Sequence, residues 1–148
     1  MKTIRKYDVN YYVSEPEQSN QNASEGVIRE FRKKWFRTMV RKQVPRDIWY
    51  YGYRHVFKTM QHTASYYGRL NVQTSIEKVT GEIPDIAELL DFGFYDCCWY
   101  RENSGLGKTL HGRWLGVSHR VGTLVLYWIL TQRDTVISRT TVQHVTHL

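Results

Sequence analysis

Apolar side chains recur at every fourth position between Asn22 and Arg41, and this spacing predicts an α-helix with one buried stripe. The stripe consists of Val27, Phe31, Trp35 and Met39. A second helix is predicted from Pro45 to about Ser65, because a proline in the first turn of a helix forfeits no hydrogen bond. Two amphipathic helices separated by so short a break predict a packed helical pair.

Short β-strands are predicted before and after this pair. Residues 7–13 are rich in Tyr and Val, which is typical of a strand. After Phe92, five segments are rich in aromatic and β-branched residues, namely 94–100, 112–117, 124–130, 135–138 and 141–145. Strands at this spacing, separated by short polar breaks, predict a small five-stranded antiparallel β-barrel.

The segment between the helices and the strands has the signals of a short helix. Thr74 is followed three residues later by Glu77, as in a capping box, and Gly81 predicts the end of the helix. We therefore expect an α+β chain in three parts: residues 1–68 with one strand and two long helices, a connector over 69–91, and the barrel over 92–148.

The charge of the chain favours a polyanionic partner. The formal net charge is +7 and the isoelectric point is about 9.5, so nucleic acid is the first expectation and a membrane surface the second. No stretch approaches the ~18 consecutive apolar residues of a membrane span, and no signal peptide is expected at Met1. Cys97 and Cys98 are neighbours and imply no disulfide framework, which indicates an intracellular protein.

The first predicted helix carries the residues with the clearest chemistry. Glu25 stands in its first turn, and a carboxylate can hold a divalent metal ion. Arg29 and Arg32 follow four and seven residues later, where guanidinium groups can hold a phosphate backbone. The alternative is a carboxylate stabilised by the helix dipole, beside a solvated charged face.

Several segments resemble the integrases of copia-type long-terminal-repeat retrotransposons. They are Asn20-Gln21-Asn22 with Glu25, Val44 to Trp49, Thr74 to Glu77, Thr80-Gly81, Pro84-Asp85-Ile86, Asp91-Phe92-Gly93, Lys108-Thr109-Leu110, Trp114-Leu115-Gly116 and Tyr127-Trp128. The order and spacing of these segments are more specific than any one of them. The resemblance implies the end of an RNase H-like catalytic core, followed by a Src-homology-3-like barrel.

The resemblance also implies roles for individual residues. Glu25 takes the place of the third metal-binding carboxylate of the family, and five side chains take places that contact DNA: Gln21, Arg29, Arg32, Lys33 and Arg37. Lys33 is the weaker candidate, because its spacing places it on the far side of the helix. The complete family enzyme uses two Mg²⁺ or Mn²⁺ ions held by two further aspartates upstream. Asp8 lies too close to Glu25 to be either of them.

We therefore expect a fragment of a retrotransposon integrase that binds DNA without sequence preference. This chain alone is expected to have no enzymatic activity and to hold no cofactor. The family further implies self-association or association with the rest of a polyprotein, and a nuclear location. Loss of the upstream core predicts that Trp35, Phe36 and Trp49 are partly exposed.

Two alternatives remain open. The barrel could be a non-enzymatic module that stacks bases or grips a peptide through its aromatic side chains, although alternation allows at most half of them to share one surface. Those side chains are Trp99, Tyr100, Trp114, Tyr127 and Trp128. A metal-independent enzyme would use Cys97 or Cys98 as a nucleophile, and an apolar strand would raise the pKa of such a thiol.

Overall fold

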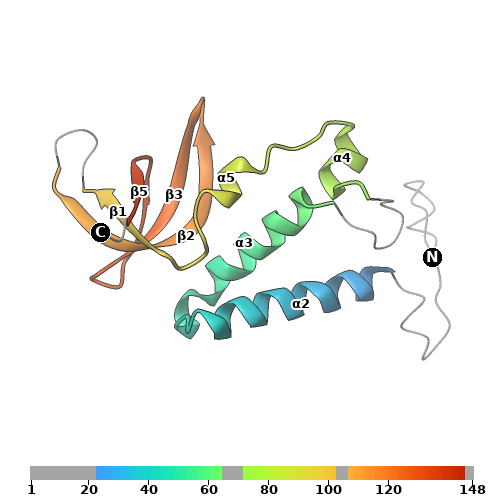
Figure 1. Ribbon diagram of the computed structural model, residues 1–148, viewed down its shortest axis with the longest axis horizontal. Helices are drawn as coiled ribbons and strands as arrows, with labels where there is room; N and C mark the ends of the chain where they lie inside the picture. The colour runs from blue at the N-terminus through green and yellow to red at the C-terminus, as the bar shows by residue number, and fades with distance from the viewer. Residues whose placement is uncertain (1–22, 65–71, 103–106, 146–148) are drawn as a thin grey trace, which may run out of the picture.

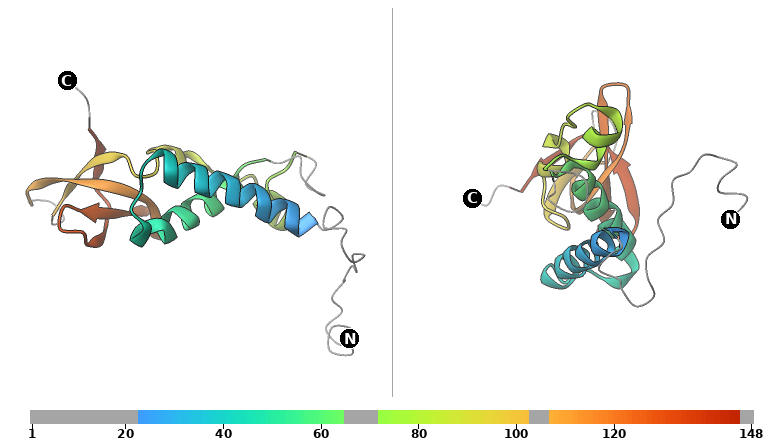
Figure 2. Two further views of the ribbon diagram at one scale, coloured as in Figure 1. Left: turned by 90° about the horizontal axis from the view of Figure 1, so that it is seen from below. Right: turned by 90° about the vertical axis from the view of Figure 1, so that its right-hand side faces the viewer.

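A computed structural model describes residues 23–64, 72–102 and 107–145 (Figure 1). The chain is α+β, as predicted, with helices first and an antiparallel sheet last. The predicted strand over 7–13 lies outside the described residues. Figures 1 and 2 show the sheet at one end of the molecule, with the N-terminal end of the first helix pointing away from it.

The predicted helical pair is present. Helix α2 spans Ala23–Arg41, and α3 spans Trp49–His62. The second helix was predicted to begin at Pro45, but its first turn is the 3₁₀-helix η2, Arg46–Ile48, which begins where Ile48 N–H donates to the Pro45 carbonyl at 3.2 Å. Proline fixes its own φ, here −56°, and thereby sets the direction of the chain into this turn.

Aromatic side chains hold α2 against α3. The rings of Phe31 and Tyr53 meet edge to face at 4.7 Å, and those of Trp35 and Trp49 do so at 5.7 Å. Trp35 Nε1 also donates to the Trp49 carbonyl at 3.2 Å, which satisfies a polar atom in an apolar contact. As predicted, Phe36 remains 57% exposed, and Trp35 and Trp49 are partly buried.

The connector forms two short helices, α4 over Ser75–Thr80 and α5 over Ala87–Leu90. The predicted capping box is confirmed: Glu77 N–H donates to Thr74 Oγ1 at 2.9 Å, and Thr74 N–H donates back to the Glu77 carboxylate. Gly81 ends α4 with a φ of +78°, a conformation that favours glycine.

The sheet is antiparallel with the strand order β4-β3-β2-β1-β5. Its strands are β1 Cys97–Arg101, β2 Thr109–Val121, β3 Leu124–Thr131, β4 Val136–Arg139 and β5 Val142–His144. The predicted number of strands is correct, but the predicted closure into a barrel is wrong. β4 and β5 are consecutive along the chain, yet among the described residues β4 pairs only with β3 and β5 only with β1.

Strand β2 is much longer than the predicted segment 112–117. It pairs with β1 along its first half and with β3 along its second, and the register shifts twice between Trp114 and His119. Gly116 lies within this irregular stretch with a φ of +109°. Such irregularities bend a strand and increase its twist, so β2 can serve both halves of the sheet.

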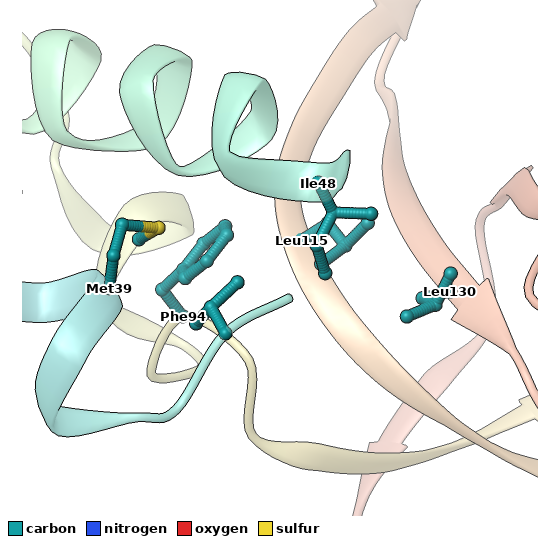
Figure 3. Close-up of a cluster of buried hydrophobic side chains, with 6 residues drawn as sticks. Met39, Ile48, Phe94, Leu115 and Leu130 are labelled. Atoms are coloured by element: carbon teal, nitrogen blue, oxygen red, sulfur yellow. The ribbon is translucent and has the colours of Figure 1, made fainter. Parts of the chain in front are cut away.

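Two apolar clusters form the core. The first joins the helices to the sheet through Met39 of α2, Ile48 of η2 and Leu115 of β2, with Val44, Phe94 and Leu130 (Figure 3). The second lies within the sheet and contains Phe92, Cys98, Tyr100, Trp114 and Ile129. The helical pair and the sheet therefore share buried side chains, and this contact fixes one end of α2.

Candidate nucleic-acid interface

The described DNA-binding candidates of α2 are exposed to solvent, and Arg32 lies next to the stripe that packs on α3, where it also lines the gap between the two helices. Phe31 and Met39 are buried on that stripe, and this burial determines which way the rest of the helix faces. Glu25, Arg29 and Arg37 are exposed to solvent. A helix anchored by one face presents the other as a rigid row of side chains.

A shallow hollow of about 380 Å³ brings four of the predicted side chains together. It is lined by Glu25, Ile28, Arg29, Arg32 and Lys33. Lys33 belongs to this group, although its spacing had placed it farther round the helix. Its Nζ lies 3.2 Å from the Glu30 carboxylate, so one of its hydrogen-bonding positions is already occupied.

The arginines of this face are available to a ligand. Within the part of the chain that the structure describes, Arg29, Arg32 and Arg37 form no ion pair and no side-chain hydrogen bond. Arg37 lies farther along α2 and does not line the hollow. Gln21 lies outside the described residues, so its place beside Glu25 stays a prediction. Exposed guanidinium groups in a row suit contacts with successive phosphates.

The residues of the hollow do not fit a two-metal centre. Among the described residues, no three His, Cys, Asp or Glu side chains come together in a way that could hold a metal ion. Glu25 is the one carboxylate of the hollow and shares it with three cationic side chains. Divalent metal ions need several oxygen ligands that converge, and the surrounding positive charge opposes their binding.

The aromatic side chains of the sheet divide between the core and one outer face. Tyr100 and Trp114 are buried, and Tyr127 and Trp128 pack against the buried clusters. Of the five aromatic residues proposed for stacking, Trp99 is the one that lies on the outer face. It is opposite His111 in the register of β1 and β2, and the ring centroids are 3.4 Å apart.

Two cations lie near this Trp99–His111 pair. Arg101 follows Trp99 on the same side of β1, and Arg113 follows His111 on the same side of β2; both are exposed. Arg113 also stacks on Tyr95 at 5.0 Å and donates to its carbonyl. The sequence could not reveal His111 as a neighbour of Trp99, because the pairing depends on the strand register.

The chemistry of the cysteines argues against a thiol nucleophile. Burial and, to a lesser extent, the neighbouring Cys97 together raise the pKa of the Cys98 thiol to about 12. This confirms the expected effect of an apolar strand. A thiol with so high a pKa supplies almost no thiolate at neutral pH. Cys97 is exposed, and the two side chains point to opposite faces of β1.

Among the described residues no helix is both long enough and apolar enough to cross a membrane. Comparison with protein-family models, with curated proteins and with solved structures finds no match to this chain.

Proposed function

We propose that this chain is the C-terminal part of a copia-type retrotransposon integrase. It binds DNA without sequence preference through the cationic face of α2, acts inside the cell and in the nucleus, and associates with itself or with the rest of its polyprotein. The observation that carries the DNA-binding part of the proposal is that Arg29, Arg32 and Arg37 are exposed and unpaired within the described residues, on a helix whose buried stripe is anchored in the core; the family origin rests on the sequence resemblance.

The physical argument for DNA rests on the backbone of the ligand. Each cation that neutralises a phosphate releases a condensed counterion, which favours binding of any sequence and makes affinity depend on salt. A net charge of +7 adds attraction at longer range. The five antiparallel strands that follow the helical pair agree in number and place with the small β-domain that the resemblance implies, although they do not close into a barrel.

We also propose that this chain alone does not catalyse the joining of DNA. Transfer of a DNA strand by the family mechanism requires two metal ions bound between convergent carboxylates. Glu25 supplies one carboxylate, and we propose that the Mg²⁺ or Mn²⁺ centre would need aspartates from outside this chain.

The binding test compares two triple variants with equal changes of charge. Arg29→Gln, Arg32→Gln and Arg37→Gln together should weaken binding to DNA of any sequence. The slope of log affinity against log salt should flatten by about one for each lost phosphate contact. The matched control is Lys78→Gln, Lys108→Gln and Arg133→Gln, which removes three exposed cations of α4 and of the loops beside β2 and β3. Fluorescence anisotropy at several salt concentrations measures both quantities.

The outcome separates two sites. If the control triple loses as much affinity as the α2 triple, binding depends on overall charge or on the sheet, and the α2 interface is refuted. A strand-transfer assay with Mg²⁺ or Mn²⁺ accompanies the titration. Joining of DNA by this chain alone would overturn the assignment of no catalysis.

A second candidate is a sheet surface that stacks unpaired bases on Trp99. The close Trp99–His111 pair with exposed Arg101 and Arg113 nearby favours it, because aromatic faces flanked by cations suit single strands. In that case Trp99→Ala should lower affinity for single-stranded DNA more than for duplex DNA. Stacking on one base is worth about 1–3 kcal/mol, so the expected loss is roughly fivefold or more.

A further inference from the structure

An apolar groove opens between the N-terminal half of α2 and the C-terminal half of α3. Its volume is about 630 Å³. Figure 1 shows the two helices close together where η2 connects them and farther apart toward the start of α2. The large apolar side chains that line the groove are Val27, Ile28 and Phe31 from α2, and Tyr53, Phe57 and Met60 from α3.

The exposure of these side chains is high for a helix face that points toward another helix. Val27 is 45% exposed, Ile28 49%, Tyr53 42% and Phe57 45%. Phe31 and Phe57 remain in edge-to-face contact with centroids 6.1 Å apart, so the groove has a packed floor. A continuous apolar patch of this kind is costly in water and marks a surface that another segment covers.

We propose that residues 7–13 of this chain cover the groove as an extended segment. In the sequence Tyr7-Asp8-Val9-Asn10-Tyr11-Tyr12-Val13, all four odd positions are Tyr or Val. Successive side chains of an extended segment point to opposite sides, so these four would face one way. One side of the segment is thus as apolar as the groove.

The length and the direction of the chain fit this occupant. Residues 1–22 precede Ala23, the first residue of α2, at the open end of the groove. Nine residues, 14–22, connect the proposed segment to the helix, and when extended they reach about 30 Å. This is enough to turn back along the helical pair.

The charge of the connection fits as well. Arg32 and Lys34 line the groove, whereas the remaining charged side chain there, Glu30, is paired with Lys33. Residues 14–22 contain Glu15 and Glu17 and no basic residue. The acidic groups of residues 14–22 are therefore attracted to Arg32 and Lys34 at the edge of the groove. A second copy of the chain would instead bring two sets of Arg32 and Lys34 together, which is unfavourable.

The test uses two pairs of substitutions in the full chain that add the same charge to opposite sides of the segment. Val9→Asp with Tyr11→Asp changes the apolar side, and Asn10→Asp with Tyr12→Asp changes the other side. Amide hydrogen exchange, followed by mass spectrometry, measures protection of residues 7–13. An apolar fluorescent dye reports exposure of the groove.

In the unchanged protein, residues 7–13 should exchange at least about tenfold more slowly than a free peptide of the same sequence. The first pair should remove this protection and increase dye binding, and the second pair should leave both unchanged. Phe57→Asp on the groove side should also remove the protection. Ile83→Asp, an exposed apolar residue on the connector, is its control. Circular dichroism verifies that each variant is folded.

Three results would overturn the proposal. Residues 7–13 of the unchanged protein could exchange as fast as the free peptide, or the two pairs could act equally. Protection that rises with protein concentration, together with a dimer in sedimentation velocity, would assign the groove to a second copy. Both pairs add the same charge, so any effect of that charge on DNA affinity should be equal for the two pairs, and only their difference in protection and dye binding tests the proposal.

Discussion

His55 lies where α3 meets the sheet, and its ring packs among aromatic side chains. The ring stacks on Phe94 with centroids 5.6 Å apart and meets Trp114 edge on at 5.2 Å. Burial and, to a lesser extent, the positive charge of Lys58 together lower the pKa of His55 from its ordinary value of 6.5 to about 4. Among the described residues its Nδ1 has no hydrogen-bond partner, so the folded protein holds the neutral ring.

Because of this histidine, the free energy of unfolding should decrease in mild acid. The folded pKa is below the unfolded one, so between pH 6.5 and about 4 the unfolded chain binds a proton that the folded chain does not. The contribution of His55 is complete above pH 6.5 and falls with decreasing pH, by up to about 3 kcal/mol near pH 4. Urea unfolding at several pH values measures this loss.

The comparison is with His55→Leu, in which this part of the pH dependence should be absent. His111→Leu, at an exposed position, should keep the acid sensitivity of the unchanged protein. An identical pH profile for His55→Leu and the unchanged protein would contradict the assignment.

The short helix α4 depends on its capping residues more than a long helix would. It has six residues, and none of them is buried. Thr74→Ala removes the side-chain oxygen that accepts from Glu77 N–H and should destabilise the helix by about 1 kcal/mol. Exchange of the Glu77 amide should then quicken about fivefold. Thr80→Ala, which removes a hydroxyl at the other end of α4, should leave this amide nearly unaffected.

Elements whose limits depend on nearby residues could be predicted from the sequence. The stripe of α2, the capping box at Thr74 and the stop at Gly81 each involve positions within a few residues of one another. The length of β2 could not be predicted, because its ends are set by pairing with two other strands. The same reason explains why sheet closure was predicted wrongly: it depends on contacts between β4 and β5.

In the candidate interface, too, contacts set by local spacing could be predicted from the sequence, and contacts set by the fold could not. Arg29 and Arg32 were expected together with Glu25 because positions three and four apart share a helix face, and they line one hollow. The pairing of Trp99 with His111 follows from the register, and the groove beside Phe57 follows from how α2 and α3 cross. Neither is encoded in local spacing.

At the scale of the molecule, Leu115 connects the helical pair to the sheet. It is 1% exposed and packs in the cluster that contains Met39 and Phe94. Leu115→Ala should lower the free energy of unfolding by about 2–5 kcal/mol, since it removes buried contacts and leaves a cavity. Circular dichroism of the helices and tryptophan fluorescence should still report one shared transition.

Leu124→Ala is the control for this change, because Leu124 is exposed at the start of β3. Its effect on stability should be small. If Leu115→Ala separated the two signals into distinct transitions, the helical pair and the sheet would be independent units.

Among the residues that the structure describes, β4 and β5 are the edge strands of the open sheet, and each has one side without a partner strand. These strands have only four and three residues, the shortest of the five. Unpaired backbone groups at the border of a sheet invite strands from other molecules, and a short border offers them few hydrogen bonds. The brevity of the last two strands thus protects this protein against fibrous aggregation, a hazard that a complete ring of strands would have removed altogether.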